Sequence, residues 1–314
     1  MSSSSDQPWL IMLIPYFGRW PEWIDLFIES CKWNPTVHWR LYTDCGEPDN
    51  RADNVEIVHL GFDDYKALVR ERLGIPFHPT APYKLCDIRP CLAYIHEREI
   101  AGFRFFGFGD IDVVYGNIRN FYTEELLKRF DVLSTHTDRL SGHFAVLRNT
   151  PKLRRAFRRI HNYRSFLEGP LYASMDEVPF ALLFKRRGGF HRIVDSFDHS
   201  RRRALFVERY STVLSKRGWH NGTMNYPQKW FWRRGHLTNE QDGNREFLYL
   251  HFMRWKYDQY MPKTPAPGEG AWLKLERIVR TDWRRAAADG FCISPEGFTN
   301  ISSPCQPLHL AGSL

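Results

Sequence analysis

The stretch Phe105–Gly116, FFGFGDIDVVYG, is the part of the sequence that decides the fold. It begins as an apolar, aromatic run typical of a buried strand, and it places Asp110 and Asp112 where that strand should end. Two carboxylates at the end of a buried strand need a partner, because an unpaired buried charge is very costly. A divalent cation is such a partner, since it takes oxygen ligands and can carry phosphate oxygens on its other positions. We therefore expect a metal–diphosphate site at these two residues.

A D-x-D triplet is also common in turns and helix caps, so its interpretation depends on the surrounding pattern. Residues 9–14, 37–42 and 55–60 have the composition of strands, and residues 21–31 and 62–73 that of helices. This alternation predicts an α/β fold whose mixed, mainly parallel sheet is flanked by helices. In such sheets ligands bind outside the carboxyl ends of the strands, where the triplet is expected to lie.

Later segments continue the pattern less regularly. We expect strands over 131–135, 142–148 and 247–250, and helices over 87–99, 117–129, 151–161, 175–187 and 272–288. Residues 262–267 have the composition of a linker, and the last residues that of a loop or tail. Residues 188–242 give no clear pattern.

The composition favours an anionic partner. The 314 residues carry a formal net charge of +8, and aromatic residues make up 15%, which suits sugar faces as well as protein cores. The basic clusters Lys152–Arg159, Lys185–Arg187 and Arg201–Arg203 are either solvated faces or surfaces that attract anionic lipid or an acidic glycan. We expect no nucleic-acid partner, because no recognised nucleic-acid motif accompanies the charge.

The cysteines and the apolar segments bear on the compartment. Six cysteines form no C-x-x-C pair, which argues against a zinc ribbon and predicts a reducing environment. The apolar run over residues 9–17 is too short to span a membrane and lacks the flanks of a signal peptide. We therefore expect a cytoplasmic protein that can lie peripherally on the inner face of the membrane.

Several short pieces, in this order and spacing, resemble the GT-A glycosyltransferases. They resemble more closely a bacterial family of such enzymes assigned to polysaccharide biosynthesis. The pieces are Tyr83–Asp87 (YKLCD), Gly109–Gly116 (GDIDVVYG), Asp131–His136 (DVLSTH), Ser141–Phe144 (SGHF), Asp176-Glu177 and His251-Phe252. The resemblance implies a GT-A domain over residues 1–260. Its nucleotide-binding half covers about residues 1–116 and its acceptor half residues 117–260, with a C-terminal helix and tail over 261–314.

The resemblance also implies an activity. It is the metal-dependent transfer of a sugar from a nucleotide-sugar donor, with a UDP-sugar favoured, to a glycan or glycolipid acceptor in surface polysaccharide synthesis. The implied cofactor is Mn²⁺ or Mg²⁺, held by Asp110, Asp112 and His251. A neutral imidazole can join two carboxylates on such an ion, and Lys256 would neutralise the diphosphate. The alternatives are an ordinary partly buried histidine and a solvated lysine.

For the donor side the resemblance implies contacts from six further residues besides Asp110. These residues are Pro15, Tyr16, Thr43, Asp44, Lys84 and Asp87. A carboxylate at Asp44 could accept from a base N–H or a ribose hydroxyl, or it could cap a turn. Lys84 and Asp87 are three residues apart, so they could instead form an internal ion pair.

For the acceptor side it implies Ser141, Gly142 and His143, with Asp176 and Glu177 as candidate catalytic carboxylates. An inverting transfer needs a base for the incoming hydroxyl, which either carboxylate could supply. A charged helix start favoured by the helix dipole is the alternative for this pair.

Two other classes of protein remain open. A non-catalytic carbohydrate-binding protein could keep the same fold. A D-x-D phosphatase is less favoured, because there the motif usually opens the domain and precedes Gly-Thr, whereas here Val113-Val114 follow and three strands precede.

Overall fold

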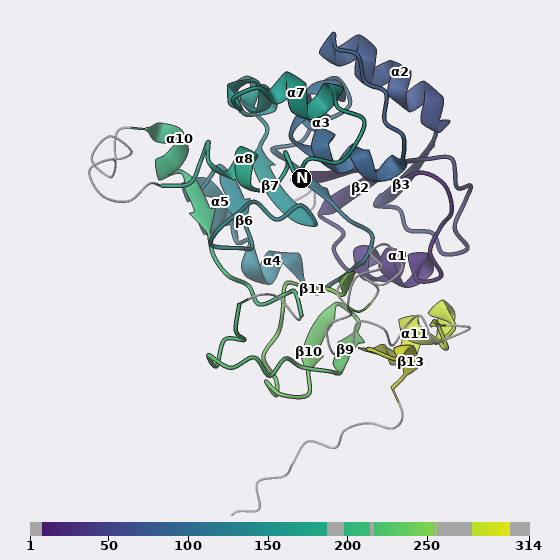
Figure 1. Cartoon of the computed structure of the whole chain (residues 1–314). Coiled ribbons are helices and arrows are strands. Elements are labelled where there is room, and N and C mark those ends of the chain that lie inside the picture. Colours follow the sequence, from purple (N-terminus) through teal and green to yellow (C-terminus); the bar gives the residue numbers. More distant parts are fainter. Residues whose placement is uncertain (1–7, 187–197, 214–216, 254, 256–277, 302–314) are drawn as a thin grey trace, which may run out of the picture.

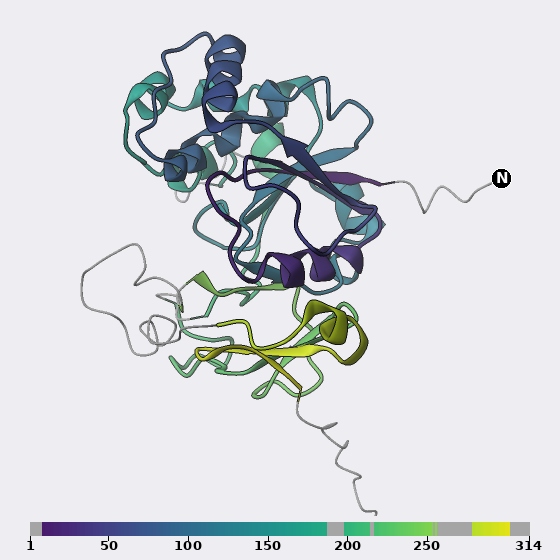
Figure 2. The same ribbon diagram turned by 90° about the vertical axis from the view of Figure 1, so that its right-hand side faces the viewer.

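The structure is a computed structural model that describes residues 8–186, 198–213, 217–253, 255 and 278–301. A seven-stranded sheet has helices on both faces, with α2, α3 and α7 above it and α1 and α4 below it in Figure 1. A smaller sheet forms a further layer beneath α1 (Figure 2).

The first elements agree with the sequence pattern. They are β1 (Leu10–Pro15), α1 (Ile24–Lys32), β2 (Val37–Thr43), β3 (Val55–His59) and α2 (Phe62–Leu73). In β1, Ile11 packs into the core on one face of the sheet, and Leu10 and Met12 pack into the core on the other. A strand that is buried on both faces has no polar side to show, which explains its continuous apolar sequence.

The order of the large sheet is β3-β2-β1-β4-β7-β6-β8, with β4 (Phe105–Gly109), β6 (Val132–Ser134), β7 (Phe144–Arg148) and β8 (Ala204–Phe206). Only β7 runs antiparallel to both of its neighbours. The mixed, mainly parallel α/β sheet is thus confirmed. The chain leaves β1 toward β2 and β3 on one side and returns as β4 on the other, so β1 and β4 flank a topological switch point.

The glycines of β4 have a packing reason. A Cβ on Gly107 would lie 2.4 Å from Met12 Sδ and 2.7 Å from the Ala145 carbonyl oxygen. The central strand therefore needs a residue without a side chain where the Met12 side chain of β1 crosses it.

Several predicted helices are shorter than expected. The segment predicted over 87–99 is a 3₁₀ helix, η1 (Pro82–Cys91), followed by α3 (Leu92–Ile95). Pro90 lies inside η1, where its missing N–H cannot continue an α-helical ladder. The helix predicted over 117–129 is divided into α4 (Ile118–Phe121) and α5 (Glu124–Arg129), because Thr123 caps the second one.

The helices predicted over 151–161 and 175–187 are also shorter than expected. The basic helix predicted over 151–161 is α6 (Pro151–Arg154) plus the 3₁₀ turn η2 (Ala156–Arg159). The helix predicted over 175–187 is α8 (Val178–Ala181). Two further helices in this part of the chain are α7 (Tyr163–Glu168) and α10 (His199–Arg202).

The smaller layer contains a strand in the segment predicted over 247–250, together with elements that the pattern did not indicate. A two-stranded sheet joins β5 (Val113–Tyr115) to β11 (Tyr249–His251). A four-stranded sheet has the order β10-β9-β12-β13, with β9 (Trp230–Arg233), β10 (His236–Asn239), β12 (Phe291–Ser294) and β13 (Gly297–Asn300). The expectation of a loop or tail was wrong for residues 291–300. Pro295 and Glu296 form the turn of a hairpin, whose two short strands have a composition that resembles an irregular tail.

The C-terminal helix is α11 (Trp283–Asp289), which begins later than predicted, while residues 262–267 and 272–277 lie outside the described residues. Residues 291–293 pair with β9, so strands on both sides of residue 260 share one sheet. The domain division at 260 stays a prediction. No helix in the described ranges has the length and apolarity needed to cross a lipid bilayer.

The hairpin belongs to the core of the molecule, which leads to a first prediction. Phe298 is fully buried and lies 5.4 Å from Phe252 and 6.0 Å from Phe291, measured between ring centroids. Phe298→Ala should lower the free energy of unfolding by about 3–5 kcal/mol, the usual effect of removing a buried phenylalanine ring. Urea denaturation measures it, with Met224→Ala as the control because Met224 is 63% exposed. Equal stability of the two variants would contradict the packing.

Candidate active site

The two aspartates follow the end of β4 but differ in exposure. The Asp110 N–H donates to the His143 carbonyl oxygen at 3.2 Å, so the turn after β4 stays attached to β7. The Trp23 indole N–H donates to the Ile111 carbonyl oxygen at 3.0 Å. The side chain of Asp112 is 5% exposed and that of Asp110 is 30% exposed. The chain therefore leaves the large sheet at the triplet and carries one buried and one accessible carboxylate.

His251 comes to this turn through strand pairing. In the pairing of β11 with β5, His251 lies opposite Val113, the residue after Asp112. His251 Nε2 is 3.6 Å from Asp112 Oδ2, and one ligand atom from each of Asp110, Asp112 and His251 lies within 4.8 Å of the others. Residues 139 positions apart in the sequence thus form one group, which we call the Asp-Asp-His group.

The chemistry of this group fits a divalent cation. His251 Nε2 is buried and makes no hydrogen bond within the described structure, which is costly unless another partner occupies that position. Two carboxylates and an imidazole are ligands that Mn²⁺ and related ions accept. Asp110, Asp112 and His251 are therefore the residues that could hold the metal.

A buried polar network orients His251. The rings of His143 and His251 stack at 3.8 Å between centroids, and Thr212 Oγ1 lies 3.4 Å from His251 Nδ1. The Tyr249 hydroxyl lies 2.9 Å from His143 Nε2. Burial lowers the pKa of His143 well below its usual value, which favours the neutral form of this ring. His143, which was predicted on the acceptor side, therefore packs on the ring of His251 and helps to fix its orientation. Residues around metal ligands commonly have this role.

Arg89 joins this group to the second pair of predicted carboxylates. Its Nη1 donates to Asp176 Oδ2 at 2.7 Å, and its Nη2 forms an ion pair with Asp110 Oδ1. Burial would lower the pKa of Arg89, but the carboxylates of Asp110 and Asp176 raise it well above its usual value. The sequence pattern did not indicate Arg89, although this residue lies two positions after the YKLCD piece.

Two of the residues predicted on the acceptor side, Gly142 and Asp176, lie against this guanidinium. A Cβ on Gly142 would lie 2.6 Å from Arg89 Nη1 and 2.7 Å from Asp176 Oδ2, so only a glycine lets these side chains meet. Asp176 is fully buried and also accepts a hydrogen bond from the Tyr172 hydroxyl at 3.3 Å. Burial raises the pKa of Asp176 to about 6, against the opposing effect of Arg89.

Glu177 and Ser141 have different surroundings. The Glu177 side chain is 41% exposed, and its Oε2 is 3.9 Å from Arg139 Nε. Ser141 Oγ is buried and accepts from the Thr135 N–H at 3.2 Å. Of these two predicted site residues, Glu177 is accessible, whereas Ser141 holds the loop that precedes β7.

Four of the predicted donor residues, Pro15, Tyr16, Thr43 and Asp44, lie at the carboxyl ends of β1 and β2. Pro15 ends β1, and the Tyr16 ring stacks on Trp20 with 5.4 Å between ring centroids. Because β1 runs parallel to β4 in neighbouring positions, Pro15 and Tyr16 lie at the same edge of the sheet as Asp110. Asp44 Oδ1 accepts from the Gly18 N–H at 2.7 Å, which agrees with its turn-capping interpretation.

Thr43 also has a structural partner, since its hydroxyl oxygen accepts from the Cys45 N–H at 3.0 Å. Lys84 and Asp87 form a fully buried ion pair with 2.9 Å between Nζ and Oδ2. Lys84 Nζ also donates to the carbonyl oxygens of Phe166 and Leu171, which uses its three donors. The geometry thus favours the internal ion pair for Lys84 and Asp87. Lys256 lies outside the described residues.

The chain matches the family of unknown function DUF6625 over residues 12–300 and belongs to that family. No curated protein matches it. Among solved structures it is similar to the galactosyltransferase LgtC in complex with donor and acceptor sugar analogues. That alignment has 10% identity and a TM-score of 0.33, and it covers 55% of this chain and 69% of the other.

It is also similar to the apo form of mouse xyloside xylosyltransferase 1. Here the identity is 8% and the TM-score 0.37, with 78% of this chain and 97% of the other covered. Both TM-scores are below 0.5, so these similarities carry no conclusion about the function of this chain.

The Lys84–Asp87 pair gives a second prediction. Asp87→Asn leaves the Lys84 charge buried without its partner, which typically costs about 3–5 kcal/mol of folding free energy. The exposed ion pair between Asp63 and Lys66 offers the control, and Asp63→Asn should leave stability nearly unchanged. Urea denaturation compares the two. If Asp87→Asn keeps wild-type stability but weakens nucleotide binding, the donor-binding interpretation of this pair is the better one.

Proposed function

We propose that the protein is a metal-dependent glycosyltransferase. It moves a sugar from a nucleotide-sugar donor, with a UDP-sugar favoured, to a glycan or glycolipid acceptor in surface polysaccharide synthesis. We place it in the cytoplasm, peripherally on the inner face of the membrane. The observation that carries the proposal is the Asp-Asp-His group at the switch point between β1 and β4.

The switch point suits a nucleotide. In open α/β sheets the crevice at this point is where nucleotides bind, and here Pro15 and Tyr16 stand on one side and Asp110 on the other. Asp110, Asp112 and His251 would hold Mn²⁺ or Mg²⁺ at the donor diphosphate. When bound, such an ion neutralises the charge that develops on a leaving diphosphate. We assign Lys256 to the same diphosphate charge, because it follows His251 by five residues.

Arg89 and Asp176 form the boundary between the donor and acceptor sides. Arg89 already contacts Asp110, so its guanidinium is positioned to compensate negative charge next to the diphosphate. Asp176, buried and bound to Arg89, fixes the orientation of that guanidinium and acts as a positioning residue. Its assignment as the base is less favoured, since no part of its side chain is exposed to an incoming hydroxyl.

Glu177 is the carboxylate that an acceptor can reach. We assign it as the base of an inverting transfer, where it takes the proton from the attacking hydroxyl. In a retaining enzyme the same carboxylate would bind the acceptor hydroxyl only. The 63% exposed Tyr83 ring meets Tyr172 edge-on at 4.9 Å between centroids, and Tyr172 also contacts Asp176. This pair offers an aromatic face for a sugar beside the carboxylates.

Removal of one metal ligand tests the donor site. Asp112→Asn keeps the shape of the buried side chain but removes its charge, so Mn²⁺-dependent binding of UDP should weaken more than about 100-fold. Loss of even an outer partner of a metal ligand typically costs about 10–100-fold. Isothermal titration calorimetry measures the binding, and EDTA should abolish it in the wild type. UDP binding in the variant that equals the wild type with Mn²⁺ present would refute the metal assignment.

The catalytic assignment has a separate test. Glu177→Gln should lower the rate of sugar transfer or hydrolysis from a UDP-sugar by roughly 10²–10⁴-fold, the usual contribution of a general base. Donor affinity should stay constant, because Glu177 is not asked to touch the diphosphate. UDP release from a panel of UDP-sugars gives the rate. An unchanged rate excludes Glu177 as the base, and an absence of turnover in the wild type with every donor favours the non-catalytic carbohydrate-binding alternative.

A further inference from the structure

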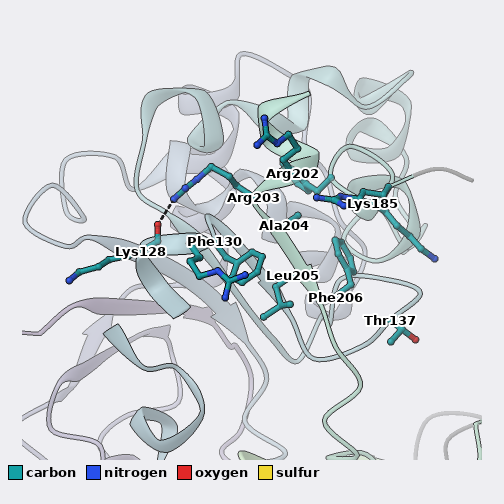
Figure 3. Close-up of a pocket in the computed structure, with 12 residues that line it drawn as sticks. Lys128, Phe130, Thr137, Lys185, Arg202, Arg203, Ala204, Leu205 and Phe206 are labelled. Atoms are coloured by element: carbon teal, nitrogen blue, oxygen red, sulfur yellow. Dashed lines mark hydrogen bonds between the residues drawn. The ribbon is translucent and has the colours of Figure 1, made fainter. Parts of the chain in front are cut away.

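A large cavity lies along the outer edge of the seven-stranded sheet, beside β8 (Figure 3). Its volume is about 830 Å³, and it is lined by Lys128, Arg129, Phe130, Thr137, Phe184, Lys185, Arg186, Arg202, Arg203, Ala204, Leu205 and Phe206. Within the described part of the chain no strand pairs with this edge of β8. We call the cavity the β8 groove.

Every charged side chain that lines the groove is basic. Arg203 is compensated, since its Nε donates to Asp131 Oδ2 at 2.7 Å. Lys128, Arg129, Arg186 and Arg202 are exposed and have no carboxylate within ion-pair distance among the residues that the structure describes. Concentrated positive charge in a concave surface attracts an anionic ligand more strongly than the same charges on a flat surface.

Apolar side chains and backbone polar groups lie between the charged residues of the groove. Figure 3 shows Phe130, Leu205 and Phe206 between Lys128 at one end and Lys185 and Arg202 at the other. On either side of β8, the Arg203 carbonyl oxygen accepts from the Val132 N–H of β6, and the Val207 N–H donates to the Ser134 carbonyl oxygen of β6. By alternation, the backbone groups of Ala204 and Phe206 face the open edge, where they can bond to hydroxyl groups.

One end of the groove reaches toward the candidate active site. Thr137 lines the groove, and the preceding residue, His136, has its ring 5.3 Å from that of His143. His143 in turn stacks on His251 of the Asp-Asp-His group. A chain-like molecule with one end at the acceptor side could therefore continue along β8.

We propose that the β8 groove binds an acidic stretch of the acceptor glycan, several sugars away from the unit that receives the new sugar. This inference rests on the proposed function. The ligand class is an oligosaccharide with carboxylate or phosphate groups, because anionic groups match the cations, hydroxyls match the open strand edge, and sugar faces match the aromatic floor. A flat bilayer surface cannot fill a concave groove, so an anionic membrane is the less favoured occupant.

The test uses a galacturonic acid hexamer as the acidic probe and maltohexaose as its neutral counterpart. The double variant Arg186→Glu/Arg202→Glu replaces two positive charges of the groove by negative ones. Lys152→Glu/Arg159→Glu makes the same change in net charge at two exposed residues of the 151–159 segment and serves as the matched control. The acidic probe should bind the wild type and the control alike, and should bind the groove variant about tenfold or more weakly, since attractive exposed pairs become repulsive ones. Maltohexaose should bind far more weakly than the acidic probe.

Three results would overturn the proposal: equal loss in both double variants, absence of acidic-probe binding to the wild type, or groove-dependent binding of phosphatidylglycerol vesicles without binding of the hexamer. Mn²⁺-dependent UDP binding, measured on the same samples, keeps the two proposals apart. The groove variant should retain it, because none of its substitutions touches the Asp-Asp-His group. Groove-dependent hexamer binding by a protein that binds no UDP would refute the glycosyltransferase while the anion site stands.

Discussion

The pairing of β11 with β5 is the constraint on which the candidate site depends. It places His251 opposite Val113 and thereby beside Asp112, across 139 positions of sequence. A shift of this register by one residue would turn the imidazole to the other face of the strand, since side chains alternate along it. The third core, in which Leu250 and Phe252 pack with Trp232 and Phe298, holds the register in place. The C-terminal hairpin therefore contributes to the site through its packing in this core.

The site contains polar groups that are costly to bury, and their contacts account for this burial. The hydroxyl of Tyr249 forms hydrogen bonds with both His143 and Thr135, and Arg89 forms ion pairs with both Asp110 and Asp176. Such networks fix one arrangement of side chains when each member has a partner. The Nε2 atom of His251 departs from this rule, and it points at the position where the two aspartates and the imidazole converge. A buried imidazole nitrogen without a hydrogen bond, next to two carboxylates, is what we expect of a protein that binds an ion there.

The sequence predicted local features well where one physical cause dominates. The apolar runs of β1 and β4 predicted buried strands of one sheet. The two carboxylates after β4 predicted a candidate metal site at the end of that strand. The contacts of Arg89 could not be predicted, because they depend on how the tertiary fold brings η1 next to Asp110 and Asp176, which are distant in the sequence. The short helices had a different cause, since Pro90 and Thr123 interrupt segments whose composition is otherwise helical. The Lys84–Asp87 pair shows that resemblance to a family motif does not fix the role of a residue. The same two residues can stabilise the fold or bind a ligand.

The central claim is that Asp110, Asp112 and His251 hold one divalent ion for a nucleotide diphosphate. The most direct measurement is a crystal structure with Mn²⁺ and UDP, in which anomalous scattering locates the manganese. The account predicts one strong anomalous peak bonded to both aspartates and to His251 Nε2, with diphosphate oxygens on its remaining positions. A UDP molecule bound elsewhere, or a peak that none of these three side chains contacts, would contradict it.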